Sequence, residues 1–129
     1  MIENHIEGTL QELLTSPVVS SFKVIRQEIA ENEGFIRIKC LLSDGGIMEF
    51  AEYLEIRSEE VSIETYSYHW QDLKGNLIRR WDNVRHHKEV PTYPHHLHLE
   101  TSEVIESIPM NLKKVLRKIE DALPTLQNI

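Results

Sequence analysis

Cysteine is nearly absent from this sequence: Cys40 is the single one among 129 residues, so no disulfide can form within the chain. Cys40 lies among apolar residues in the segment 38–42. A lone cysteine without a neighbouring activating motif is typical of a small core residue. We therefore expect Cys40 to be buried and not to act as a catalytic thiol.

Long hydrophobic segments are absent too. No apolar run approaches the roughly 20 residues of a membrane-spanning helix. The first residues, Met1–Asn4, lack the basic and apolar regions of a signal peptide. We expect a cytoplasmic protein that does not associate with membranes.

The chain also has no overall excess of basic residues. The formal net charge of −7 argues against non-specific coating of nucleic acid, because such binding depends on Lys and Arg neutralising phosphates. The hydrophobic fraction of 40% and the charged fraction of 27% are those of an ordinary globular protein. The length suits one hydrophobic core, so we expect a single domain over residues 1–129.

The charge is unevenly distributed along the chain. Between His69 and His98, five Lys or Arg residues stand against three acidic residues, whereas the rest of the chain is acidic overall. A locally cationic site on an acidic body suits binding to a basic partner protein.

Periodicity predicts an α+β fold. Apolar residues at helical spacing predict an N-terminal helix that stops at Ser16-Pro17. The same spacing predicts a C-terminal helix over Leu112–Leu123, with Pro109 near its start and Pro124 at its stop. We expect both helices to pack on one face of a sheet.

Five segments of strand-like alternation occupy Val18 to Asn83, separated by turns at residues 32–34, 43–46, 57–60 and 74–76. Because the connections are too short for helical crossovers, these strands should form a five-stranded antiparallel meander. Residues 83–107 show no clear period, and we expect a long ordered loop. Such loops tend to carry function.

Histidine is concentrated in one region, because six of the seven histidines lie between positions 69 and 98. Imidazole titrates near neutrality, so one histidine can act as a base and another as an acid. Arginine can hold a phosphate through paired N–H donors. These groups are what metal-independent RNA cleavage needs, and the expected catalytic residues are His69, Arg80, Asp82, His86, His87, His95, His96 and His98.

Substrate contacts are expected close by. Tyr66, Tyr68 and Trp70 share a strand face and offer surfaces on which unpaired bases can stack. The expected substrate-binding residues are Tyr66, Tyr68, Trp70, Arg79, Asn83 and Arg85.

Each of these features has a structural alternative. The aromatic stripe at 66–70 is also typical of sheet packing. Arg79 and Arg80 point to opposite faces of a strand, so at most one should join a given site. Asp82-Asn83 is consistent with a turn cap. His69 is predicted on the same face as Val61 and Ile63, which suits a hydrogen-bonded core histidine.

Two further hypotheses stay open beside catalysis. The first is a histidine-ligated metalloprotein, since His86, His87, His95, His96 and His98 include adjacent and i, i+2 pairs that can ligate zinc or nickel. They match no established motif such as His-Glu-x-x-His, so we predict neither a metal nor another cofactor. The second is a non-catalytic module that binds protein or nucleic acid. His5 stands apart and is expected at the surface.

Three short segments form an ordered string of motifs. They are Tyr66-Ser67-Tyr68-His69-Trp70-Gln71-Asp72, then Arg80-Trp81-Asp82-Asn83-x-x-His86-His87, then Pro94-His95-His96-x-His98. In order and spacing they resemble the TumE-type toxin family of prokaryotic toxin/antitoxin systems. The resemblance implies a small toxin that inhibits growth and is neutralised by a cognate antitoxin.

The family pattern carries over to Tyr68, His69, Arg80, Asp82, Asn83, His86, His87, Pro94, His95, His96 and His98. Val84-Arg85 stands where the pattern has an Ala-Pro-like pair, and Leu97 replaces a commonly basic residue, so both differences bear on substrate contacts. The leading hypothesis is an RNA-cleaving toxin in which His95 or His96 transfers protons, Arg80 stabilises the phosphate and Asp82 orients a histidine. A free sheet edge also allows a homodimer.

Overall fold

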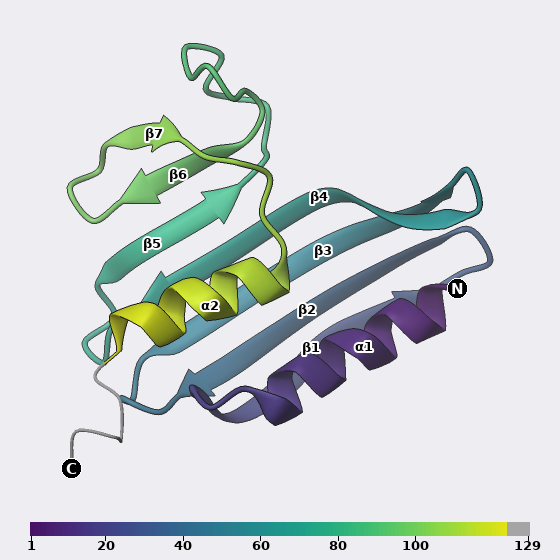
Figure 1. Cartoon of the computed structure of the whole chain (residues 1–129), viewed down its shortest axis with the longest axis horizontal. Coiled ribbons are helices and arrows are strands. Elements are labelled where there is room, and N and C mark those ends of the chain that lie inside the picture. Colours follow the sequence, from purple (N-terminus) through teal and green to yellow (C-terminus); the bar gives the residue numbers. More distant parts are fainter. Residues whose placement is uncertain (124–129) are drawn as a thin grey trace.

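The computed structural model describes residues 1–123, which form two helices and seven strands (Figure 1). The elements in chain order are α1 (Ile2–Thr15), β1 (Val19–Ile29), β2 (Glu33–Leu42), β3 (Ile47–Arg57), β4 (Glu60–Gln71), β5 (Leu77–Asp82), β6 (His96–Leu99), β7 (Val104–Glu106) and α2 (Leu112–Ala122). The predicted α+β class is confirmed. Pro124, the expected stop of the second helix, lies outside the described residues.

All strands belong to one antiparallel sheet with the order β1-β2-β3-β4-β5-β6-β7. Each strand pairs with the next one along the chain, so the predicted meander is confirmed. The sheet has seven strands where we expected five. The five predicted strands are β1 to β5, and the four predicted turns lie at the connections between them.

The two additional strands lie in the segment that was expected to be one long loop. β6 pairs with β5, and β7 pairs with β6. Strands of four and three residues are too short to give a reliable period, and the prolines at 91 and 94 indicate a loop. The alternation of histidine and leucine across residues 96–99 was the one signal for β6.

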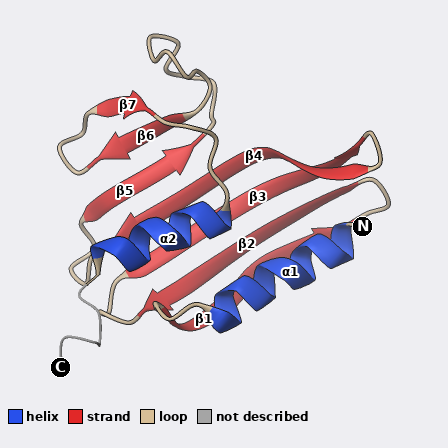
Figure 2. Cartoon of the chain, viewed as in Figure 1, coloured by secondary structure: helices blue, strands red, loops and turns tan. Residues whose placement is uncertain are grey.

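Both helices pack on the same face of the sheet, as predicted (Figures 1 and 2). Their buried side chains, among them Ile6 and Leu13 of α1 and Val115 and Ile119 of α2, form one core with the apolar side chains of that sheet face. We call the other side of the sheet the open face. No helix within residues 1–123 is long and apolar enough to cross a membrane.

The start of α2 is fixed by its cap. The side chain of Asn111 accepts a hydrogen bond from the Lys114 backbone N–H at 2.9 Å, which satisfies one of the free donors at the start of the helix. Pro109 precedes this cap, as expected from the sequence.

A β-bulge in β4 reverses the facing of its second half. Leu54 pairs with Ile63, whereas Tyr53 pairs with Thr65, so one extra residue is accommodated between the two pairs. Val61 and Ile63 therefore face the helices, and His69 lies on the open face. The prediction that His69 shares the face of Val61 and Ile63 is wrong. It assumed that side chains alternate strictly between the two faces of the sheet, and the inserted residue breaks that alternation.

Cys40 is completely buried, as predicted, and burial raises the pKa of its thiol to about 12. Since the thiolate is the reactive form, its population at neutral pH is lowered roughly 10³-fold. We expect a disulfide exchange reagent to label the native protein far more slowly than the urea-unfolded protein, as followed by the absorbance of the released thiol. Rapid stoichiometric labelling of the native chain would contradict this burial.

Candidate functional site

Asp82 is a buried carboxylate at the end of β5, with only 2% of the residue exposed. Its Oδ1 atom lies 2.8 Å from His96 Nε2 and accepts a hydrogen bond from the Val84 backbone N–H at 3.0 Å. Its Oδ2 atom accepts a hydrogen bond from Arg80 Nε at 3.1 Å and lies 3.2 Å from His98 Nε2. Every contact of this carboxylate is therefore with a donor or a ring nitrogen.

The pairing of β5 with β6 brings these side chains together. Asp82 is opposite His96, and Arg80 is opposite His98. Residues two apart on a strand point to the same face, so both pairs lie on one face of the sheet. That face is the open face, since Trp81 between them is part of the core. The register of a short strand pair thus builds the site.

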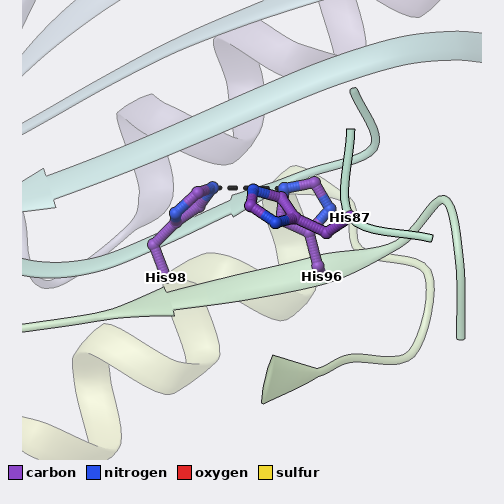
Figure 3. Close-up of side chains that lie close together, drawn as sticks. All are labelled: His87, His96 and His98. Atoms are coloured by element: carbon purple, nitrogen blue, oxygen red, sulfur yellow. Dashed lines mark hydrogen bonds between the residues drawn. The ribbon is translucent and has the colours of Figure 1, made fainter. Parts of the chain in front are cut away.

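His87 joins the same group from the loop between β5 and β6. Its ring centroid lies 4.9 Å from that of His96 and 5.6 Å from that of His98 (Figure 3). We call Arg80, Asp82, His87, His96 and His98 the Asp82 cluster.

The exposure of the histidines in the cluster differs. His96 is only 2% exposed, and its Nδ1 donates to the Pro94 carbonyl oxygen at 2.9 Å. The side chain of His98 is 27% exposed. Burial lowers the pKa of His98, although the Asp82 carboxylate opposes this effect. The neutral imidazole of His98 is therefore favoured near pH 7.

A groove of about 350 Å³ lies on the open face beside the cluster. Its lining is mostly polar and consists of Arg37, Lys39, Ile47, Glu49, Ser67, His69, Gln71 and Arg80. Three of these side chains are basic and one is acidic. Arg80 belongs to both the groove and the Asp82 cluster, so the two are continuous.

The remaining predicted catalytic histidines lie outside the cluster. His69 is opposite Arg80 on β4 and lines the groove, where its Nε2 is 3.2 Å from Gln71 Oε1. His86 is exposed in the loop after β5. His95 stacks on Tyr66 with 5.8 Å between ring centroids, and burial lowers its pKa.

The predicted aromatic contacts are placed in the core. Tyr66, Tyr68 and Trp70 are all buried on the helix side of the sheet. The Tyr68 ring lies 5.6 Å from Phe50 and 5.4 Å from Tyr66, measured between centroids. In this arrangement the stripe packs the sheet, and its rings do not offer a surface for stacking bases.

The other predicted substrate contacts are also dispersed. Arg79 pairs with Trp70 on the face opposite to Arg80, and its Nη1 donates to the Ile78 carbonyl oxygen. Arg85 is exposed in the loop. The Asn83 side-chain amide donates to the Glu64 carbonyl oxygen and accepts from the Tyr66 N–H, both at 2.9 Å, so it supports the bulge in β4.

Sequence reasoning missed a second buried carboxylate, Glu52, which lies under α1. The Tyr68 hydroxyl donates to Glu52 Oε2 at 2.5 Å, and His5 Nε2 lies 3.1 Å from Glu52 Oε1. His5, expected at the surface, is partly buried there, with 25% of its side chain exposed. The available signal was that Glu52 shares its face of β3 with Phe50 and Leu54, which are fully buried.

The family model described as Toxin TumE matches residues 9–123, which include the whole Asp82 cluster and the groove. No curated protein and no solved structure matches the chain. The match defines the protein as a toxin. More particularly, the chain belongs to the TumE toxin family, which confirms the resemblance of its motifs and implies an antitoxin partner.

The role of Tyr66 can be tested by removing its hydroxyl. This oxygen accepts from the buried Met110 N–H at 3.2 Å and lies 2.8 Å from His95 Nδ1. Tyr66→Phe leaves the Met110 amide without this partner, so we expect the free energy of unfolding to fall by about 1–3 kcal/mol in urea titrations. Growth inhibition should persist in cells that express the variant.

Tyr93→Phe, in the loop before β6, is the matched control and should change stability by less than about 0.5 kcal/mol. Loss of growth inhibition by a folded Tyr66→Phe protein would contradict the packing role and assign the side chain to function.

Proposed function

We propose that this toxin cleaves RNA at the Asp82 cluster, with the phosphates of the substrate bound in the open-face groove. The observation that carries the proposal is the position of Arg80. Its Nε donates to Asp82 at 3.1 Å, while the same side chain lines the groove. One guanidinium thus joins a surface suited to phosphate with a group of imidazoles and a carboxylate.

The groove offers basic groups and room for a nucleotide-sized part of a nucleic acid. Arg37, Lys39 and Arg80 line it, although Arg37 is also paired with Glu49 at 3.2 Å and Arg80 with Asp82 at 3.1 Å. The volume of about 350 Å³ is within the range of roughly 300–1,000 Å³ typical of small-ligand sites. Because the whole chain carries a net charge of −7, phosphate attraction is concentrated at this basic surface.

RNA is the favoured substrate because its 2′-hydroxyl can act as the nucleophile. Cleavage then needs a base for that hydroxyl, an acid for the leaving 5′-oxygen and fixed positive charge at the phosphorus. Arg80 supplies the charge. Arg80 is paired with His98 on β6 and with His69 on β4, so the two histidines would flank a phosphate bound at Arg80.

The buried His96 is unsuited to direct contact with a substrate. At 2% exposure it acts through its neighbours, whereas His98 is accessible. His98 takes the proton of the 2′-hydroxyl, and His69, on the other side of Arg80, gives a proton to the leaving 5′-oxygen. If the ring nitrogens of His87, His96 and His98 held a metal ion, that ion would supply a base of lowered pKa in place of His98.

Replacing Arg80 tests the proposal. Arg80→Ala removes the phosphate contact, and loss of such a donor typically costs about 10²–10³-fold in rate. We expect RNA cleavage by the purified protein to fall by this factor, and growth inhibition to disappear. Arg80→Lys should fall in between, because lysine keeps the charge and loses the planar pair of donors.

Arg26→Ala, on the exposed far strand β1, is the matched control and should behave as wild type. Total RNA that stays intact in cells arrested by the wild-type toxin would rule out RNA as the target. Full activity of a folded Arg80→Ala protein would reject the proposed position of the phosphate.

A further inference from the structure

Three histidine rings converge in one place (Figure 3), and one of them, His96, contacts Asp82. His87 comes from the loop after β5, and His96 and His98 come from β6. One ring nitrogen of each lies within 4.8 Å of the other two, and His96 Nε2 is 3.1 Å from His98 Nε2. Nitrogen ligands of a tetrahedral zinc ion lie about 3.3 Å apart, because each Zn–N bond is ~2.0–2.1 Å long. The His96–His98 pair already has this spacing, and the His87 nitrogen lies within 4.8 Å of both.

The hydrogen bonds of His96 show why a cation suits this point. A carbonyl oxygen can only accept, so the bond from His96 Nδ1 to the Pro94 oxygen places a proton on Nδ1. In the neutral ring Nε2 is then unprotonated, and it faces His98 Nε2 and Asp82 Oδ1. A proton there satisfies one of these acceptors. A metal ion satisfies all of them, which matters in a buried site where unpaired polar atoms are costly.

Asp82 brings a carboxylate to two of these rings, His96 and His98, and its neighbours hold it in place. Its two oxygens lie 2.8 Å from His96 Nε2 and 3.2 Å from His98 Nε2. The Val84 N–H and Arg80 Nε donate to these oxygens. Hydrogen bonds of this kind, to the carboxylate and from the far nitrogen of an imidazole, commonly orient metal ligands in proteins.

We propose that His87, His96, His98 and Asp82 bind one divalent transition-metal ion, with zinc as the representative ion. Imidazole and carboxylate donors without a thiolate suit zinc, iron(II) and nickel. The proposal goes beyond RNA cleavage and does not require RNA to be the substrate. It departs from our expectation of no metal and takes up the alternative of a histidine-ligated metalloprotein. No established metal motif marks the site, which arises from the loop and the β5–β6 pairing.

An ion at this position would lie next to Arg80 and thus at the edge of the groove. A metal ion can lower the pKa of a bound water to about 7, which makes hydroxide available at neutral pH. The imidazoles of the cluster are then ligands and not proton carriers. This consequence, unlike the metal site itself, rests on the proposed function.

Metal binding is tested on the full-length chain without a histidine tag. After removal of metal by a chelator, the protein is titrated with Zn²⁺ in competition with a chromophoric chelator. We expect one ion per chain, and an affinity that falls more than about 100-fold in His98→Ala, beyond the loss typical of an outer-shell change. His86→Ala, the exposed neighbour of His87, is the matched control and should bind as wild type.

Thermal unfolding gives a second readout. Zn²⁺ should raise the Tm of the wild type and of His86→Ala, because a ligand that binds the native state stabilises it, and should not raise the Tm of His98→Ala. His87→Ala changes only a loop residue and gives the same test if His98→Ala fails to fold. Wild-type protein without stoichiometric zinc affinity, or two ligand variants that bind as tightly as wild type, would overturn the proposal. Intact RNA together with normal zinc binding would reject RNA cleavage alone.

Discussion

The carboxylate of Asp82 has almost no contact with solvent. The arrangement of the side chains around it on the open face depends on how its negative charge is compensated. A buried charge is costly unless it is paired and hydrogen-bonded. Arg80, His96, His98 and the Val84 N–H surround it, and all belong to β5, β6 or the residues directly after β5. The short pairing of β5 with β6 therefore determines the chemistry of the site, while Trp81 of β5 joins the core on the other face.

The two faces of the sheet carry different groups of residues, one for the core and one for the candidate site. Apolar residues and both helices occupy one face, and polar residues of β2 to β6 occupy the other. Each strand alternates between the two environments, so the same strand that places Trp81 in the core presents Arg80 and Asp82 on the open face. The bulge in β4 transfers His69 to the open face, next to Arg80. A register change of one residue thus adds an imidazole to the groove.

The helices, the turns between β1 and β5 and the core position of Cys40 could be predicted from the sequence. Hydrophobic periodicity and the residue types of turns are local signals. The sequence was insufficient where the outcome depends on pairing across the sheet. β6 and β7 are too short for a period, and the bulge in β4 shifts the facing of His69. The histidine concentration indicated the region of the site. Only the fold could separate His87, His96 and His98 from His86 and His95, and reveal Glu52 as the partner of His5.

The measurement that tests the role of Asp82 most directly is an NMR titration of the His98 imidazole in metal-free protein. Burial lowers the pKa of His98, and the Asp82 carboxylate raises it in opposition. Asp82→Asn removes the negative charge, so the pKa of His98 should fall further below its value in the wild type. Glu28→Gln, on the exposed edge strand β1, should leave that pKa unchanged. An unchanged or higher pKa of His98 in a folded Asp82→Asn protein would contradict the account.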